Sequence, residues 1–259
     1  MRRALYILAL LAAMNSNAQM SAWYGRAAYA ATTTSAPPAN TNAPPYTTGL
    51  AFYLDARDYA SFNGYRITNA TDRSGINSVT NIYDNQGALA TNYGGYASLK
   101  LNSADSLIGY RLSPGVPCTN KVLVVQVHNR TTSGRNASLA YSGANGQYAF
   151  NINNNTAIYT GLGDGAAANA GTPAPTGGVV CVTSWRDGTT NCVIRINGVK
   201  IGSASLAPSS ATMNRFGIIQ DTYSCNGMYL YCALAWTNTD FTAEQVAEIE
   251  NWTKTIWSW

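Results

Sequence analysis

The sequence predicts an all-β protein: an antiparallel β-sandwich (jelly roll) with one C-terminal helix and an extended N-terminal arm. Short apolar stretches recur along the chain, and turns rich in Asn and Gly separate them. Residues 177–202 carry two hairpin signals in succession, Asp187-Gly188 and Asn197-Gly198, because both dipeptides suit type I′ turns. The 259 residues are enough for one large β-domain, and only 11% of them are charged, which is typical of β-rich surface proteins.

The N-terminus, residues 1–19, has the pattern of a secretory signal. Two arginines precede a short apolar run, and Ser16-Asn17-Ala18 fits the small-residue cleavage site of such signals. The apolar run is too short to span a bilayer stably. Two outcomes are therefore open: the segment is cleaved during export, or it is retained as an anchor.

Residues 20–48 are predicted to form a Pro- and Thr-rich arm or linker. Pro37-Pro38 and Pro44-Pro45 interrupt both helices and central strands, because proline lacks a backbone N–H. The folded domain is predicted to cover residues 49–259.

Within this domain the periodicity predicts strands of several kinds. Apolar residues alternate over 50–54, which indicates a half-buried strand, whereas 121–128 is almost continuously apolar, as expected of a central strand. Further strands are expected at 78–83, 96–101, 107–112, 147–151, 156–160, 215–220 and 228–236.

The register of the central hairpin can be predicted from its turn. A two-residue turn at Asp187-Gly188 would pair Trp185 with Thr190 and Cys181 with Ile194. One face, directed to the core, would then hold Cys181, Thr183, Trp185, Cys192, Ile194 and Ile196.

The chain has five cysteines, which are expected to include small buried apolar residues. Cys181 and Cys192 would be diagonal neighbours in the predicted register, so no disulfide is expected between them. An odd number leaves at least one thiol unpaired in a monomer, and the pairing stays open among Cys118, Cys181, Cys192, Cys225 and Cys232.

The C-terminus changes to helical periodicity after Phe241. Thr242 is a good N-cap, Gln245 completes a capping box, and Phe241 with Val246 can form a hydrophobic staple. The helix is expected to pack on the sandwich through Ala243, Val246, Ile249, Trp252 and Ile256.

Three stretches resemble a known family. The opening GLAFYLDARDYASF contains Asp55 and Asp58, Asp72-Arg73-Ser74-Gly75 follows, and the ending ALAWTNTDFTAEQVAEIENWTKTIW joins a strand to a short helix. Together with the central hairpin, these stretches resemble laminin-G-like domains of the concanavalin A-like lectin/glucanase superfamily, of the kind found in phage and bacterial surface proteins. Ala70 and Thr71 stand where the family pattern has a tryptophan. The resemblance covers about residues 49–259 and implies a jelly roll.

The sequence offers no recognisable catalytic group, so a non-enzymatic protein is predicted. The glucanases of the superfamily use paired glutamates on one strand, whereas Glu244, Glu248 and Glu250 all lie in the predicted helix. His128 is the only histidine, and a hydrogen-bonded structural role is expected for it.

No metal site or other cofactor is predicted from cysteine and histidine spacing. The resemblance implies calcium binding as one alternative, because laminin-G-like domains often bind this ion. Asp164 and Asp221, in predicted loops, are the calcium candidates.

Two hypotheses of function follow. In the first, the protein is a structural or adhesion component of a bacteriophage virion, a capsid decoration or fibre, whose arm binds other virion or surface proteins while the jelly roll binds glycans. In the second, it is a secreted bacterial cell-surface module that binds glycans. The net charge of +4 without a basic run argues against nucleic-acid binding. The ligand-binding residues and the oligomeric state are not assigned by the sequence.

Overall fold

The structure, a computed structural model, describes residues 43–82, 87–101, 109–117, 121–132, 136–137, 139–140, 151–153, 157–160, 168–169, 175–187, 191–205, 212–219, 223–224 and 227–259. The predictions for the signal-like segment, for most of the arm, and for Cys118, Cys225, Asp164 and Asp221 fall outside these residues.

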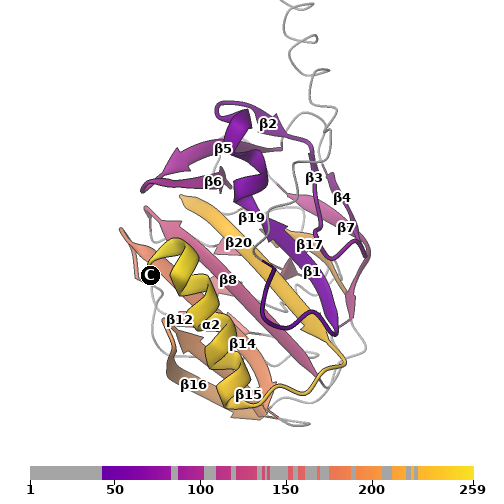
Figure 1. The fold of residues 1–259 in the computed structure, drawn as a ribbon, viewed down its shortest axis with the longest axis vertical. Helices are drawn as coiled ribbons and strands as arrows, with labels where there is room; N and C mark the ends of the chain where they lie inside the picture. Colours follow the sequence, from indigo (N-terminus) through magenta and orange to yellow (C-terminus); the bar gives the residue numbers. More distant parts are fainter. Residues whose placement is uncertain are drawn as a thin grey trace, which may run out of the picture. The chain divides into compact units, whose positions relative to one another are not determined.

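The main sheet is antiparallel and has nine strands among the described residues (Figure 1). Eight follow the order β16-β15-β14-β8-β20-β6-β5-β2, and β1 pairs with β20. Their bounds are β1 Leu50–Asp55, β2 Arg66–Ile67, β5 Ala88–Tyr93, β6 Tyr96–Lys100, β8 Val122–Arg130, β14 Val179–Asp187, β15 Asn191–Ile196, β16 Val199–Ser205 and β20 Met228–Thr237. Strand β8 lies in the middle and is buried at every position, which confirms the prediction of a central strand.

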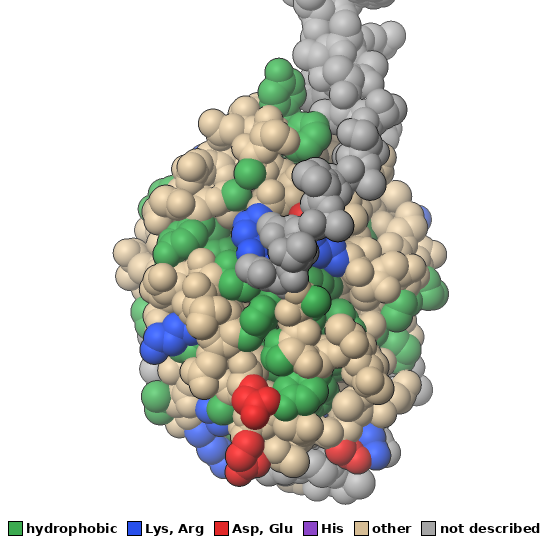
Figure 2. Space-filling view, in the orientation of Figure 1, with side chains coloured by type: hydrophobic (Ala, Val, Ile, Leu, Met, Phe, Trp, Pro, Cys, Tyr) green, Lys and Arg blue, Asp and Glu red, His purple; other side chains and the backbone are tan. Residues whose placement is uncertain are grey.

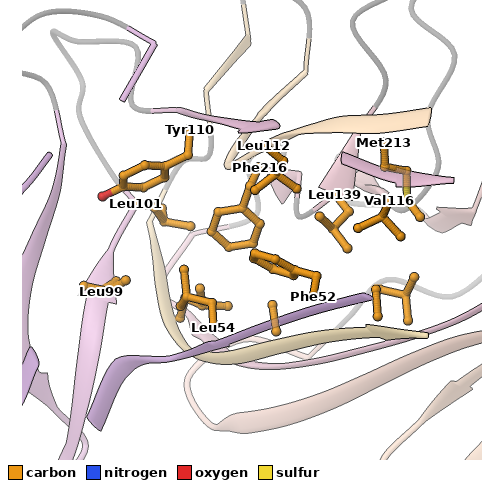
Figure 3. Packing of buried hydrophobic residues seen from close by; sticks show 14 of the residues in the cluster. Phe52, Leu54, Leu99, Leu101, Tyr110, Leu112, Val116, Leu139, Met213 and Phe216 are labelled. Carbon is orange, nitrogen blue, oxygen red and sulfur yellow. The ribbon is translucent and has the colours of Figure 1, made fainter. Parts of the chain in front are cut away.

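A second antiparallel sheet faces the main one in the order β10-β17-β7-β4-β3. Its strands are β3 Asn69–Ala70, β4 Ser78–Asn81, β7 Tyr110–Pro117, β10 Leu139–Ala140 and β17 Thr212–Phe216. Apolar side chains from both sheets meet between them: the rings of Phe52 and Phe216 lie 5.8 Å apart, and Tyr110 and Leu112 pack beside them (Figure 3). Shorter strands are β9 Asn136–Ala137, β11 Asn151–Asn153, β12 Ala157–Thr160, β13 Ala168–Asn169, β18 Ile218–Ile219 and β19 Tyr223–Ser224.

The helix α2, Ala243–Trp257, lies on the other face of the main sheet, over β8 and β14 (Figure 1). Thr242 and Gln245 form the predicted capping box. Val246 and Ile249 are buried in a second apolar cluster that also contains strand residues such as Leu123, Val125 and Trp236. Ala243 is exposed, so its predicted packing is wrong. No helix within the described ranges is long and apolar enough to cross a membrane.

The central hairpin has a different register from the predicted one. Trp185 pairs with Val193 and Asp187 with Asn191, so three residues rather than two join the strands. This odd shift places Ile194 on the opposite face from Cys181 and Trp185. Cys192, Ile194 and Ile196 point between the two sheets, whereas Cys181 and Trp185 point toward α2.

The cysteines of this hairpin are nevertheless buried, as predicted. Cys181 and Cys192 lie on opposite faces of the sheet, and among the described cysteines these two and Cys232 are thiols that form no disulfide.

Strand β1 is also more deeply buried than the sequence predicts. Its residues alternate between the two apolar clusters, Phe52 and Leu54 facing the second sheet and Tyr53 facing α2. Because both faces are covered, five of its six residues are buried rather than half of them.

Candidate functional site

The three glutamates all lie on α2, as the sequence predicts. Glu244 and Glu248 are exposed on α2, and Glu250 is buried against Arg195, whose Nε lies 3.0 Å from its carboxylate. Within the described residues, no group of three His, Cys, Asp or Glu side chains could hold a metal ion.

His128 is enclosed between the sheets rather than presented to a substrate. It is fully buried, and its Nδ1 lies 3.1 Å from Gln126 Nε2, which agrees with the expected hydrogen-bonded structural role. Burial, and then the nearby charge of Arg130, lower the pKa of His128 to about 3, so the ring is neutral at pH 7.

The aspartates of the opening motif belong to a buried ion network. Asp55 ends β1 and accepts hydrogen bonds from Arg57, while Arg73 pairs with both Asp55 and Asp58. The Arg73 guanidinium also lies 5.1 Å from the centre of the Tyr53 ring. The two arginines and two aspartates of this network balance one another in charge. Their ion pairs also join β1 and the 3-10 helix η1, Ala56–Phe62, to the turn that contains Arg73.

Asp72 fixes the same turn by a second set of hydrogen bonds. Its carboxylate accepts from the backbone N–H groups of Tyr53, Ser74 and Asn77, at 2.8, 2.9 and 2.8 Å. Asn77 in turn donates to the carbonyl of Ala51 at 2.7 Å. The motif residues that carry the family resemblance are therefore structural, because their polar atoms are used within the domain.

A cluster of tyrosines on the main sheet is better placed to meet a ligand. The rings of Tyr93 and Tyr229 are stacked, with centres 3.8 Å apart and planes 9° apart, and Lys100 Nζ lies 5.8 Å from the centre of the Tyr229 ring. Tyr96 packs edge-on against Tyr231. We call Tyr93, Tyr96, Lys100, Tyr229 and Tyr231 the tyrosine platform; all but Tyr231 are partly exposed.

The strand pairing explains how residues so distant in sequence meet. Gly94 and Gly95 both have positive φ, 61° and 85°, and form the tight turn that sets Tyr93 opposite Tyr96. Strand β20 runs beside β6 and sets Tyr229 opposite Lys100.

The neighbours of these residues show which way the platform faces. Leu99 and Leu230 point between the sheets, so Lys100 and Tyr229, which alternate with them, point outward on the α2 side. Figure 2 shows that charged side chains are few on this side of the described residues.

Tyr231 is the buried member of the platform and supports the other rings. It is fully buried, its hydroxyl donates to the Tyr93 carbonyl at 3.1 Å, and burial raises its pKa to about 12. A neutral, hydrogen-bonded Tyr231 thus supports the more exposed rings.

The sequence holds a signal for this site that periodicity alone does not single out. Tyr93 and Tyr96 flank a Gly-Gly turn, and Tyr229 and Tyr231 alternate in a strand, so each pair could be assigned to one face. The two pairs share one face because β6 lies between β5 and β20. This strand order brings together residues that are far apart in the sequence.

Comparisons with known proteins relate the chain to several carbohydrate-active or toxin proteins by structure. No protein-family model and no curated protein matches the sequence. Domain 4 of the extracellular arabinanase AbnA from Geobacillus stearothermophilus superposes with a TM-score of 0.54 at 16% identity, covering 78% of this chain and 98% of that domain. The binding domain of botulinum neurotoxin serotype D gives 0.57 at 14% identity, covering 79% and 52%. Trypanosoma rangeli sialidase gives 0.56 at 10%, covering 90% and 38%.

These similarities bear on architecture, since the identities are low and the chain spans about half of the toxin domain and less of the sialidase. The two facing antiparallel sheets, the C-terminal helix and the superpositions agree on one fold. The chain therefore has a jelly-roll β-sandwich fold, as its resemblance to laminin-G-like domains predicts.

Proposed function

We propose that this protein is a non-enzymatic carbohydrate-binding domain that serves in adhesion, and that the tyrosine platform holds the sugar. The observation that carries the proposal is the outward-facing pair of stacked rings, Tyr93 and Tyr229, with Lys100 beside them. This combination offers apolar ring surface together with hydroxyl and ammonium groups on one face of the sheet.

The chemistry of this surface suits a saccharide. A pyranose or furanose ring has apolar C–H faces that pack on an aromatic ring and a rim of hydroxyl groups that form hydrogen bonds. Tyrosine supplies both kinds of contact with few rotatable bonds. The mutual stacking of Tyr93 and Tyr229 already orients the rings, so a ligand loses little binding free energy in ordering them.

Several of the structural relatives are described in complex with saccharides. AbnA domain 4 is described with arabinotriose, and a botulinum neurotoxin DC binding domain with SialylT. The latter superposes with a TM-score of 0.56 at 11% identity. These relatives support carbohydrate as the ligand class without identifying the sugar that this chain binds.

The setting of the domain stays a prediction from the N-terminal sequence. Display on a bacteriophage virion requires the arm to be retained, whereas export to a bacterial surface predicts loss of residues 1–18. The intact mass of the protein isolated from its natural source separates the two.

A glycan array with the full-length protein tests carbohydrate binding, and titration calorimetry with the best ligand tests the platform. We expect Tyr93→Ala and Tyr229→Ala each to weaken binding by about tenfold, as for loss of a central aromatic contact. Tyr65→Ala is the matched control, because Tyr65 is 52% exposed and is not part of the platform.

Circular dichroism of each variant separates lost binding from lost folding, since cross-strand aromatic pairs also stabilise sheets. Absence of binding to every glycan on the array, or equal affinity of the wild type and the two platform variants, would contradict the proposal.

A further inference from the structure

The outer face of the second sheet carries a row of polar residues that crosses four strands. The pairing runs from Asn69 on β3 to Thr80 on β4, then to Arg111 on β7 and to Arg215 on β17. Ser78 and Ser113 form a second exposed pair beside this row. The face therefore offers amide, hydroxyl and guanidinium groups side by side.

Burial of the alternate residues fixes the direction of the two arginines. Tyr110 and Leu112, which flank Arg111, are buried between the sheets, as is Phe216 next to Arg215. Since side chains alternate along a strand, Arg111 and Arg215 both point away from the core. Arg111 is exposed and Arg215 partly exposed.

The two arginines are directly opposite one another, which is electrostatically unfavourable without a counter-charge. Like charges at opposed positions of neighbouring strands destabilise a sheet. No acidic residue occurs in the sequences of β3, β4, β7, β10 or β17, so the sheet itself supplies no carboxylate. Arg215 has an interaction of its own, so the inference rests on the exposed Arg111 and on the shared face.

We propose that this face, which we call the arginine face, binds the carboxylate or sulfate group of an acidic saccharide. Guanidinium groups bind such anions through paired N–H donors, which gives directional as well as electrostatic recognition. Asn69, Thr80 and Ser113 lie within the same row or the next one and supply hydrogen bonds for sugar hydroxyls.

The arginine face is separate from the tyrosine platform. The platform lies on the outer side of the main sheet, and the arginines lie on the outer side of the second sheet, so the hydrophobic core separates them. The inference takes its ligand class from the proposed carbohydrate binding but uses different residues, so substitutions can test the two independently.

The test uses calorimetry on the full-length protein with three acidic probes: trigalacturonate, 3′-sialyllactose and a heparin tetrasaccharide. Galactotriose and lactose are the uncharged counterparts, and sodium sulfate is the simple anion. We expect at least one acidic probe to bind, and Arg111→Ala to weaken it by about tenfold, the effect of one charge-assisted contact. Raising the salt concentration is expected to weaken it as well.

Two controls assign the effect to this face. Lys200→Ala removes an exposed positive charge from β16 in the main sheet and is expected to leave the affinity unchanged. Tyr93→Ala is likewise expected to leave the Arg111-dependent binding unchanged. The melting temperature of Arg111→Ala, measured beside that of the wild type, shows whether the variant is folded.

The outcomes separate the two proposals. Acidic probes that bind equally well to the wild type and Arg111→Ala overturn the arginine face, even if uncharged sugars bind through Tyr93. Binding of sulfate alone also overturns it, because the site would then be selective for a simple anion. Arg111-dependent binding of acidic sugars, with none of uncharged sugars, supports the arginine face and counts against the tyrosine platform.

Discussion

Replacing Arg73 with methionine is expected to cause a large loss of stability. Its guanidinium donates to Asp58 Oδ2 at 2.8 Å and to the Tyr53 hydroxyl at 3.1 Å, and it lies 2.9 Å from Asp55 Oδ2. Methionine fills much of the same volume but removes the charge and all of these contacts. Asp55 keeps Arg57 as a partner, whereas Asp58 loses the only ion pair that the described residues give it.

The magnitude follows from burial. The Asp58 side chain is 4% exposed and that of Arg73 is 14% exposed, so solvent does little to replace the lost interaction. Burial lowers the pKa of Arg73, but the hydrogen bond with Asp58 and the charge of Asp55 raise it by more, so its net pKa lies above that of free arginine. Removing one partner of a buried ion pair costs about 3–5 kcal/mol, a large part of the roughly 5–15 kcal/mol that stabilises a domain.

Urea unfolding followed by tryptophan fluorescence measures this loss. A decrease of about 3 kcal/mol in the free energy of unfolding lowers the midpoint by roughly 1 M or more. Adding Asp58→Asn to Arg73→Met is expected to restore at least about 1 kcal/mol, because it removes the unpaired buried charge. Arg66→Met is the control, since Arg66 is partly exposed and donates to the Gly87 carbonyl at 3.1 Å.

A loss below about 1 kcal/mol for Arg73→Met would refute the reasoning. So would a double variant that is less stable than the single one.

Three further predictions concern local features. His128 has a folded-state pKa of about 3 against 6.5 for free histidine, so the unfolded state takes up the proton first as the pH falls. Between pH 6 and 3 the wild type should therefore lose up to about 1.4 kcal/mol per pH unit more than His128→Gln, and equal slopes in pH-dependent unfolding would contradict this. Thr242→Ala removes the N-cap of α2 and should cost about 1 kcal/mol in urea unfolding, whereas the exposed Thr255→Ala should cost clearly less. Gly227→Ala should cost about 2 kcal/mol, because Gly227 has a φ of 60° and a Cβ would lie 2.5 Å from Thr132 Oγ1; an unchanged melting temperature would count against this strain.

Features that depend on a few neighbouring residues could be predicted from the sequence. The capping box of Thr242 and Gln245 is one, since both hydrogen bonds close within a single helical turn. The nearly continuous apolar run of β8 is another, because the second sheet covers one face of this strand and α2 covers the other.

The register of the central hairpin could not be predicted, for a related reason. The predicted register assumed a two-residue turn at Asp187-Gly188, and the predicted orientation assumed that the larger apolar groups mark a single buried face. In the structure both faces are buried, one by the second sheet and one by α2, so Ile194 and Trp185 are core residues on opposite sides. The alternation of side chains therefore does not tell which face of the hairpin points to the second sheet. Only the number of residues in the connecting loop distinguishes the predicted register from the observed one. Asp187 continues the strand and pairs with Asn191 instead of forming the turn.

The two candidate binding surfaces could not be predicted from the sequence. Asp55, Asp58 and Asp72 stand out in the sequence, but their carboxylates form ion pairs and hydrogen bonds within the domain. The residues proposed to bind a ligand are tyrosines and arginines, and they come together only because β20 lies beside β6 and β17 beside β7. In this sandwich the polar motif of Asp55, Asp58 and Asp72 maintains the fold, whereas the proposed recognition depends on side chains whose proximity is set by strand order.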